Sequence, residues 1–482
     1  MKDYSFGNYI CALRTGLGLS QFQLGALVGV SDKAVSKWEN ADAKPRIGTC
    51  RRLAAVLGVS IDQLLSCEHE ITISARKELE KMNSDLWKEA YRRLEIYGRQ
   101  PPTLCLSRLA AEEATLRDTD AIQSIAFLGR LQEQARKHNT VAVAAGMVHS
   151  SFAAWLFGAT PVNPLPAHYR CPCCGAVEFA PEGVDGFDLP PRQCACGGEL
   201  LRDGHGIPYQ GYAQSVRRRT NLEIRMSSEF MPHAVAMLRE FYEGVAQILP
   251  IRYDFGDGSR PMERYAIVTD DKQKPPISED GFWHCSWEEY WQWRGREMTY
   301  MFIPSKQIDT LESQVRQSGE LLPEPTALMT SGMFRDLYQC RCGQYPNVAG
   351  LATGEGNCTF RRLIRMDGMA HGTFTQTQWE WFRTLPFDEI PATREDIYDT
   401  VSAALAARGV RDEGFALLVT ENAQKGLYHS RGIPESHLAA LTSMELPQWY
   451  PDYLRNTRYL FPKGHCIAHL LLDGLCRQYS KH

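Results

Sequence analysis

The sequence has no long apolar segment and no large excess of either charge. No run of roughly 18 apolar residues occurs in the 482-residue chain, and its first residues, MKDYSFGNYICALR, lack the apolar core of a secretory signal peptide. The chain carries 53 basic and 57 acidic residues, so its formal net charge of −4 provides no overall attraction to nucleic acid. These absences argue against a membrane protein. We therefore expect a cytoplasmic protein in which any affinity for DNA comes from local patches.

Cysteine, by contrast, is plentiful. The chain has 15 cysteines and is long enough for about three domains, each with its own core. In a small secreted protein such a number would indicate a disulfide framework, but in a large cytosolic chain it indicates buried thiols and metal ligands. The closest spacing occurs between Cys171 and Cys196.

Between Ser5 and Leu65 the pattern predicts five short helices. The segments SQFQ at Ser20 and SIDQ at Ser60 have the form of capping boxes, in which serine and glutamine satisfy the first backbone groups of a helix. We expect Leu24 and Leu27 to face inward and Gly29 to form the turn before a third helix. That helix, beginning in SDKAVSKWEN, has Val35 and Trp38 on its buried side.

This region resembles the Cro/CI-type helix-turn-helix over its full length, including LSQFQLGALVGVSDKAVSKWENADAKPR. The resemblance implies that the third helix enters the major groove of double-stranded DNA. It implies four residues that read bases, which are Asp32, Lys33, Ser36 and Lys37. It also implies three contacts to the DNA backbone, from Arg14, Gln21 and Arg46. The alternative is a helix-turn-helix that serves only for protein binding or dimerisation.

Residues 71–96 predict a charged linker helix. Its apolar residues recur at steps of three and four and form one stripe: Leu79, Met82, Leu86, Ala90 and Leu94. This stripe either pairs two chains or packs on the following domain. We expect a homodimer, because one small recognition helix seldom supplies enough contact for specific binding.

From about residue 97 the chain resembles the PolC-type bacterial DNA polymerase III alpha subunit. The motifs that carry the resemblance are AVAAGMVHSSF, CPCCG, TNLEIRM and FPKGHCIAHLLLDGLCRQYSK, which correspond to the family's phosphate loop, zinc cysteines, metal-binding strand and fingers. Relative to that family we expect the exonuclease and phosphoesterase domains and the clamp-binding elements to be lacking. The helix-turn-helix stands in place of the front half.

The resemblance also implies that the catalytic carboxylates have been lost. Nucleotidyl transfer uses two divalent ions held by carboxylates, and the family's motif PDIDLNF supplies two of these. Asn221 and Glu223 stand at those two positions, and the third aspartate of the family aligns with Phe302. We therefore expect a non-catalytic polymerase-like body that does not bind magnesium.

Four further residues are candidates for phosphate contacts. In the phosphate loop of the family, serine and glycine residues surround the triphosphate, and here Ser150 and Ser151 are kept. The fingers segment keeps Lys463 and His465. For this last pair the plainer interpretation is a lysine at a helix start and a histidine with ordinary hydrogen bonds.

The cysteine spacing predicts a structural zinc site. Cys171 and Cys174 form the first pair and Cys194 and Cys196 the second, with small residues after each pair that let backbone N–H groups approach sulfur. The second pair is one residue shorter than in the family, so Cys173 remains an alternative ligand. Four thiolates leave no position for water, which favours a structural ion.

Together these features predict an α+β protein. We expect a helix-turn-helix domain at 1–70, the linker helix at 71–96, a polymerase-beta-like nucleotidyltransferase palm at 97–165 and 205–318, a zinc-ribbon insertion at 166–204 and a mostly helical fingers-like domain at 319–482. The predicted function is sequence-specific DNA binding in transcriptional regulation. Two alternatives stay open: an active or altered DNA polymerase in which Glu223 binds metal, and a decoy that binds a replication or phage protein.

Overall fold

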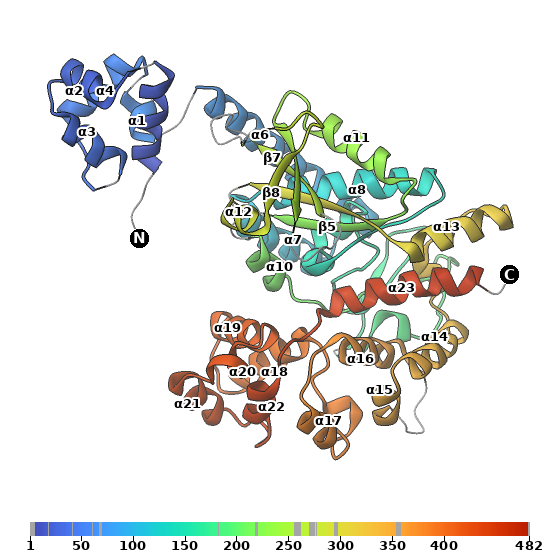
Figure 1. Ribbon diagram of the computed structural model, residues 1–482. Helices are drawn as coiled ribbons and strands as arrows, with labels where there is room; N and C mark the ends of the chain where they lie inside the picture. Colours follow the sequence, from blue (N-terminus) through green and yellow to red (C-terminus); the bar gives the residue numbers. More distant parts are fainter. Residues whose placement is uncertain are drawn as a thin grey trace. The chain divides into compact units, whose positions relative to one another are not determined.

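The computed structural model describes residues 5–17, 19–40, 42–59, 61–66, 70–181, 183–216, 220–254, 262–268, 275, 277–293, 297–352 and 358–480. Ser60, with its expected capping box, lies outside them. Helices and strands occur together (Figure 1), which confirms a mixed α+β fold. Contacts divide the chain into two compact units: the first comprises Met1–Met82 and Tyr242–Glu289, and the second comprises Asn83–Phe241 and Tyr290–His482.

The first unit begins with the five expected helices. They are α1 (Ser5–Gly16), α2 (Gln21–Val28), α3 (Asp32–Glu39), α4 (Ile47–Leu57) and α5 (Ile61–Ser66). The capping box at Ser20 is present, since its side chain accepts from the backbone of Gln23 while the Gln23 side chain accepts from the backbone of Ser20. Gly29 ends α2 with a φ of 76°, a left-handed conformation that glycine adopts without steric cost.

Hydrophobic residues from α1 to α5 form one core. Leu24, Val35 and Trp38 are buried in it, as expected. The prediction for Leu27 is wrong, because its side chain is 59% exposed. Val28 is buried instead of Leu27. Because successive side chains of a helix are rotated by about 100°, Val28 points closer to the direction of the buried Leu24 than Leu27 does.

A buried ion pair joins α1 to the end of α3. The guanidinium of Arg14 donates from Nε to Glu39 Oε1 over 2.7 Å and from Nη2 to Glu39 Oε2 over 3.0 Å. Gln21 Nε2 also donates to Glu39, over 2.7 Å. Burial alone would raise the pKa of Glu39, but the hydrogen bonds from Arg14 and Gln21 lower it below its usual value.

Three strands complete the described part of the first unit. These are β6 (Gln247–Asp254), β7 (Met262–Val268) and β8 (Trp283–Ser286). Strand β6 pairs with β7 in antiparallel and with β8 in parallel orientation. Arg252 on β6 bridges two carboxylates, donating to Glu263 over 2.7 Å and to Asp280 over 2.8 Å.

Helix α6 (Glu70–Arg92) covers most of the predicted linker, and its second half belongs to the second unit. The 3-10 helix η1 (Arg93–Tyr97) follows directly and contains Leu94. Side chains that are no more than 2% exposed include Trp87, Ala90 and Leu94. This burial fits the interpretation that the end of the apolar stripe packs on the following domain. Helix α12 (Trp287–Trp293) also belongs partly to each unit.

The sheet of the second unit contains β1 (Ala142–Ala144), β5 (Asn221–Met226) and β9 (Met298–Pro304), in the order β1-β5-β9. Strand β5 pairs in antiparallel orientation with β1 and in parallel orientation with β9. Phe127 of α8 (Ala121–Lys137) covers one face of this sheet. Its ring centroid lies 5.0 Å from that of Tyr300 and 6.4 Å from that of Phe302, both on β9. Helix α8 therefore packs its aromatic side chain on the buried face of this sheet.

A separate small sheet lies within the segment predicted to be a zinc ribbon. Its strands are β2 (His168–Arg170), β3 (Val177–Phe179) and β4 (Leu201–Asp203), with β2 in the middle of an antiparallel arrangement. The ribbon touches the end of η1 through two glycines, Gly98 and Gly175, both with positive φ. A Cβ on Gly175 would lie 2.6 Å from the Cα of Gly98, so the two backbones are in direct contact.

The remaining described elements of the second unit are mostly helical. The helices are α7 (Thr103–Leu116), α9 (Phe152–Leu156), α10 (Gln210–Ser215), α11 (Met231–Phe241), α13 (Lys306–Ser318), α14 (Ser331–Gln344), α15 (Pro346–Leu351), α16 (Phe360–His371), α17 (Gln376–Phe382), α18 (Arg394–Ala407), α19 (Glu413–Gln424), α20 (Leu427–Arg431), α21 (Glu435–Ser443), α22 (Tyr450–Asn456) and α23 (Lys463–Tyr479). Short 3-10 helices are η2 (Gly146–Ser150), η3 (Gly186–Asp188), η5 (Pro325–Leu328) and η6 (Phe387–Glu389). Helix α23 contacts α13, α14 and α16 and is central to this part (Figure 1).

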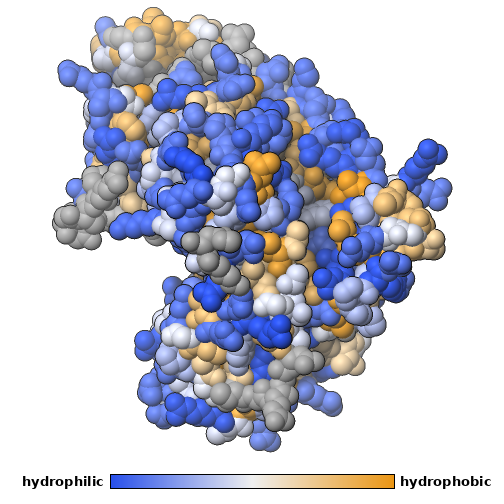
Figure 2. Space-filling model, turned by 90° about the vertical axis from the view of Figure 1, so that its right-hand side faces the viewer, coloured by the Kyte–Doolittle hydropathy of each residue, from blue (hydrophilic) through white to orange (hydrophobic). Residues whose placement is uncertain are grey.

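The surface of the protein is mainly polar on the face drawn in Figure 2. Among the residues shown in colour, hydrophobic side chains form separate small groups between charged ones. None of the described helices combines the length and the apolar character that crossing a bilayer requires. No single broad apolar surface is therefore visible among the coloured residues of this face.

The Arg14–Glu39 pair predicts a specific loss of stability. Replacing Arg14 with methionine leaves the Glu39 carboxylate buried without its cation, which costs about 3 kcal/mol. We expect hydrogen exchange of the α3 amides in the full chain to become about a hundredfold faster. Arg51→Met, at an exposed position on α4, is the control and should leave the exchange unchanged.

The effect should depend on pH in one direction. Because the pKa of Glu39 is lowered in the folded state, its ionised form contributes stability above the usual carboxyl range, and this contribution is lost as the pH falls through the lowered pKa. The difference between Arg14→Met and the parent should therefore narrow on acidification. A difference that stays constant with pH would contradict this account.

Candidate functional site

Helix α3 presents the residues predicted to read DNA bases. Asp32, Lys33 and Lys37 are exposed and Ser36 is half-buried, while Val35 and Trp38 hold the helix to the core. The expected readers thus lie on one side of α3. Asp32 also accepts from the backbone N–H of Lys33 over 2.8 Å, so its carboxylate stabilises the start of the helix.

The expected contacts to the DNA backbone are only partly accessible. Arg46 is exposed in the extended residue before α4. Arg14 is 9% exposed, and its guanidinium donates to Glu39 and to the carbonyl of Leu19. These contacts lie within the protein, and the contact of Arg14 to the DNA backbone stays a prediction. Gln21 is half-buried and donates to the same carboxylate.

The outward face of β5 carries one carboxylate. Asn221, Glu223 and Arg225 alternate with buried residues along this strand, so they share a face. Asn221 Oδ1 accepts a hydrogen bond from the hydroxyl of Thr299 on the neighbouring β9. Thr299 and Met301 lie opposite Asn221 and Glu223 in the parallel register.

Phe302 does not belong to this face. It is paired with Ile224 and its ring packs against Phe127 of α8, on the opposite side of the sheet. The position on β9 that shares a face with Glu223 is Met301. Phe302, the position aligned with the third aspartate of the family, is therefore one residue away from the strand face that carries Glu223. Neither Phe302 nor Met301 has a carboxylate.

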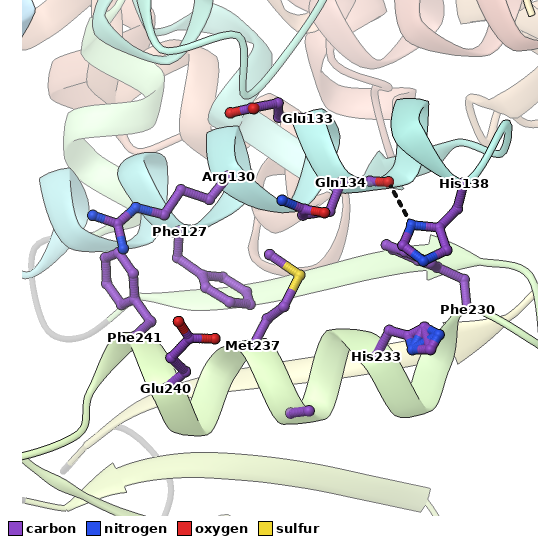
Figure 3. A pocket seen from close by; sticks show the side chains of 11 residues that line it. Phe127, Arg130, Glu133, Gln134, His138, Phe230, His233, Met237, Glu240 and Phe241 are labelled. Carbon is purple, nitrogen blue, oxygen red and sulfur yellow. Dashed lines mark hydrogen bonds between the residues drawn. The ribbon is translucent and has the colours of Figure 1, made fainter.

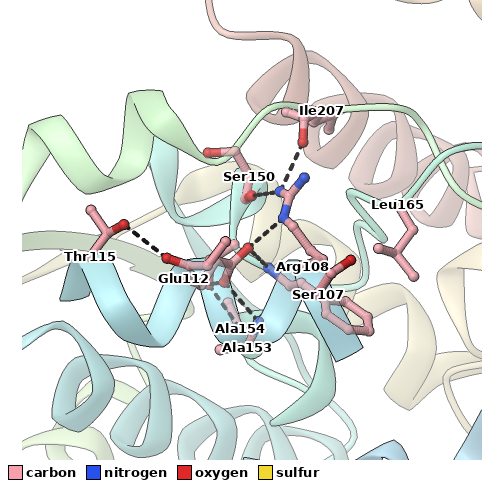
Figure 4. Close-up of polar contacts among 12 residues, drawn as sticks. Ser107, Arg108, Glu112, Thr115, Ser150, Ala153, Ala154, Leu165 and Ile207 are labelled. Atoms are coloured by element: carbon pink, nitrogen blue, oxygen red, sulfur yellow. Dashed lines mark hydrogen bonds and ion pairs between the residues drawn. The ribbon is translucent and has the colours of Figure 1, made fainter. Parts of the chain in front are cut away.

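The segment that resembles a phosphate loop is filled by a carboxylate of the protein itself (Figure 4). Glu112 of α7 accepts from the backbone N–H groups of Phe152 and Ala153, over 2.8 and 3.1 Å, at the first turn of α9. Its other bonds come from the hydroxyl of Ser151 (2.9 Å) and Nε of Arg108 (2.8 Å). These donors would otherwise be available to an anion.

Ser150 and Ser151 are thus not placed to contact a phosphate, contrary to the prediction. Both are buried, at 2% and 0% exposure. The Ser150 hydroxyl donates to the carbonyl of Met147 over 2.6 Å, and the Ser151 hydroxyl is used by Glu112 and by the backbone of Ala154. Sequence analysis missed Glu112 and its partner Arg108, although their spacing of four on one helix is a signal of an ion pair.

A cavity of about 320 Å³ lies beside β1 and β5. Cationic or titratable side chains from several elements line it: Arg225, Arg341, His371, His465 and His469, together with Asp473. His465 is the one residue of the predicted phosphate contacts in this lining. Burial, with the neighbouring His469 and His149, lowers the pKa of His465 to about 2, so it is neutral at physiological pH.

Lys463 is held away from this cavity. Its ammonium group donates to the backbone carbonyl of His205, and its backbone N–H donates to Glu395 over 2.7 Å. These bonds fit the interpretation of a lysine at the start of α23 with structural contacts. The signal that could have found the cavity is the pair His465 and His469, which the four-residue spacing places on one side of α23.

A second cavity, of about 550 Å³, is lined by α8 and α11 (Figure 3). Its walls include Arg130 and Glu133 of α8, and His233 and Met237 of α11. His138 lies at one end with its ring centroid 4.9 Å from that of His233. The residues predicted from the sequence as site residues are not among those that line this cavity.

Four cysteine sulfurs converge in the small sheet. The ligand atoms of Cys171, Cys174, Cys194 and Cys196 lie within 4.8 Å of one another, and the Sγ atoms of Cys171 and Cys196 are 3.5 Å apart. A tetrahedral ion with Zn–S bonds of about 2.3 Å separates its sulfurs by about 3.8 Å, so the group fits zinc. Cys173 lies outside this group.

Backbone geometry favours a thiolate at Cys171, whereas hydrogen bonds with the neighbouring cysteines raise the pKa of Cys174 and that of Cys196. Backbone N–H groups of Cys174 and Cys173 point at Cys171 and lower the pKa of its thiol to about 6. Gly175 and Gly197, with φ of 74° and 88°, follow the two pairs and allow these tight turns. The group can therefore hold a metal ion such as zinc.

Comparison with known proteins agrees with both resemblances. A family model described as Helix-turn-helix matches residues 12–64. Over 462 residues the chain is 23% identical to the DNA polymerase III PolC-type of Staphylococcus haemolyticus, covering 80% of this chain and 31% of that protein. The Thermotoga maritima protein of the same name is 23% identical over 478 residues, which is 82% of this chain and 33% of that protein. The chain thus spans about a third of the length of these distant relatives.

The cysteine group predicts a matched pair of substitutions. Cys174→Ser removes one of the four convergent sulfurs, so we expect the bound zinc to fall by about one equivalent per chain. Cys173→Ser, at the neighbouring residue outside the group, should keep the metal. Metal content by mass spectrometry and thiolate-to-cobalt absorption of the Co²⁺-substituted protein measure the difference. If Cys173→Ser loses the metal instead, Cys173 is a ligand and the set of four convergent cysteines is wrong.

Proposed function

We propose that this protein is a sequence-specific DNA-binding protein that regulates transcription. The observation that carries the proposal is the exposed side of α3, where Lys33 and Lys37 are available while Val35 and Trp38 anchor the helix. The Helix-turn-helix match over residues 12–64 supports the same role. In this proposal α3 enters the major groove of double-stranded DNA, where polar side chains reach base edges.

In the same proposal the protein acts as a homodimer on a palindromic site. The described part of the helix-turn-helix offers one short reading helix of eight residues, and a dimer doubles the number of half-sites contacted. Asp32 accepts from cytosine, whereas the lysines contact guanine or phosphate. Arg46 is the exposed candidate for a backbone contact.

The polymerase-like body is proposed to be non-catalytic. Two divalent ions need several carboxylates on one strand face, and the face of β5 offers Glu223 beside Asn221 and Arg225. A cation on that face disfavours magnesium further. Glu112 supports the proposal as well, because its carboxylate occupies the backbone donors at the start of α9.

The proposed domains comprise the residue ranges 1–70, 71–96, 97–165, 166–204, 205–318 and 319–482. Zinc in the 166–204 segment is proposed to be structural, since all four ligands are cysteines and none is left for water. In this view the ribbon stabilises the body and the helix-turn-helix performs the recognition.

The regulator proposal predicts that substitutions in α3 weaken binding to one specific DNA sequence. Purified full-length protein should enrich one palindromic sequence from fragmented genomic DNA. The Lys33→Ala/Lys37→Ala double variant should bind that sequence at least about 30-fold more weakly, because it removes two base contacts that contribute about 1–3 kcal/mol each. The matched control is Lys88→Ala, which removes a lysine of α6 whose side chain is 73% exposed.

Two results would contradict the proposal. If the double variant enriches the same sequence as the parent, α3 is not the reading element. If Lys88→Ala weakens binding as much as the double variant does, the lysines act through general charge. Circular dichroism of all variants establishes that the folds are kept.

The non-catalytic body predicts an absence of primer extension. With magnesium or manganese, a primed template and all four deoxynucleotides, we expect no extension above a no-protein control, while a PolC-type polymerase under the same conditions extends the primer. Added magnesium and nucleotide should leave the thermal unfolding unchanged. Extension that Glu223→Ala abolishes would establish the alternative function, an altered nucleotidyltransferase.

A further inference from the structure

Two histidines that line the 320 Å³ cavity, His371 and His469, meet the buried carboxylate of Asp367 behind them, far in sequence from the cysteine group. Asp367 and His371 lie four residues apart on α16, and His469 comes from α23. The ligand atoms of the three residues lie within 4.8 Å of one another. Asp367 Oδ2 is 3.6 Å from Nδ1 of His371 and 3.5 Å from Nδ1 of His469.

Nδ1 of His371 also lies 3.0 Å from the backbone carbonyl of Asp367, a contact that an ion at Nδ1 would replace. The two separations between Oδ2 of Asp367 and the imidazoles match a metal site more closely than a hydrogen-bonded pair. Both exceed the 2.7–3.2 Å range of good hydrogen bonds. A tetrahedral ion with bonds of about 2.0–2.1 Å separates its ligand atoms by about 3.3 Å. One carboxylate oxygen and two imidazole nitrogens that lie about this far apart leave room for an ion at the centre of the three ligand atoms.

Buried atoms at this place lack other partners. Asp367 is 0% exposed, and within the described residues neither Oδ2 of Asp367 nor Nε2 of His469 has a hydrogen-bond partner. Burying a polar atom without a partner costs about 1–3 kcal/mol, so each such atom requires an explanation. A bound cation would satisfy the carboxylate oxygen directly.

The surrounding charges hold the carboxylate in position without consuming it. Arg341 contacts Oδ1 of Asp367 over 2.6 Å and also Asp473 over 2.6 Å. The single positive charge of Arg341 is thus shared by two carboxylates. Among these three groups one negative charge is left over and can be neutralised by a bound cation. Oδ1 is held by Arg341 while Oδ2 faces the histidines, an arrangement in which an outer partner orients a metal ligand.

From this geometry we propose that Asp367, His371 and His469 bind a divalent transition-metal ion in the wall of the cavity. Two imidazoles and one carboxylate suit zinc, cobalt or iron(II) better than magnesium, which prefers oxygen ligands alone. Three protein ligands leave at least one coordination position open. The cavity that His371 and His469 line also contains Arg225, a cation that could pair with an anionic co-ligand.

This site is distinct from the palm carboxylates and from the cysteine group. Its ligands come from α16 and α23, whereas Glu223 is on β5 and the cysteines lie beside β2 and β4. The inference does not rest on the proposed DNA-binding function, because no residue of the helix-turn-helix takes part.

The test uses full-length protein purified with its zinc ribbon loaded. Titration with Co²⁺ reports the two kinds of site separately, since thiolates give an intense near-ultraviolet band and a histidine–carboxylate set gives only visible absorption. We expect about one equivalent of Co²⁺ to bind with visible absorption alone. Asp367→Asn, His371→Gln and His469→Gln should each weaken this binding more than about tenfold, because even changes to outer partners of a metal cost 10–100-fold.

Two controls make the result specific. His429→Gln changes an exposed histidine of the same unit and should leave Co²⁺ binding unchanged. Cys174→Ser, which alters the cysteine group, should leave the visible Co²⁺ band unchanged. Near-ultraviolet circular dichroism without added metal shows whether each variant keeps the parent fold, and His371→Gln and Asp367→Asn are close in size to the residues they replace.

Three outcomes would overturn the proposal. The first is Co²⁺ binding that stays unchanged in folded His469→Gln and Asp367→Asn. The second is binding that appears only with a thiolate band. The third is an equal loss in His429→Gln, which would indicate non-specific binding to surface histidines.

Discussion

A single buried carboxylate, with its arginine partner, joins three segments of the polymerase-like part. Glu112 satisfies the start of α9 and pairs with Arg108, whose guanidinium also donates to the carbonyls of Ser150 and Ile207, over 2.8 and 2.9 Å. Helix α7, the loop before α9 and the chain after β4 are therefore held at one point. Because a buried ion stays only where its hydrogen bonds are complete, these segments must keep their positions together.

The same arrangement supports the proposal that the body is non-catalytic. The backbone donors and the positive end of α9 already face an internal anion, so an external phosphate has little to gain there. On the sheet face Asn221 and Arg225 stand beside Glu223, and the nearby cavity is lined by Arg341 and histidines. Two arginines thus line the cavity, and one of them, Arg225, is on the strand that carries Glu223.

Local patterns are readable from the sequence, but pairings across the chain are not. The capping box at Ser20 and the four convergent cysteines depend on short spacings, so the sequence predicts them. The sequence does not reveal the pair of Arg14 with Glu39, because the two residues lie 25 positions apart. Phe302 is misplaced because a shift of one residue in a strand reverses its face. Asp367 and His469 meet only through the packing of α16 on α23.

The contact between Gly98 and Gly175 has a consequence for sequence variation. Each glycine has a left-handed backbone, and a methyl group on Gly175 would overlap the backbone of Gly98. A larger residue at Gly175 could be accommodated only if the ribbon moved away from η1, whereas a Cβ on Gly98 would lie 3.3 Å from the carbonyl oxygen of Gly175. Chains that keep the ribbon seated in this way are therefore expected to vary least at Gly175.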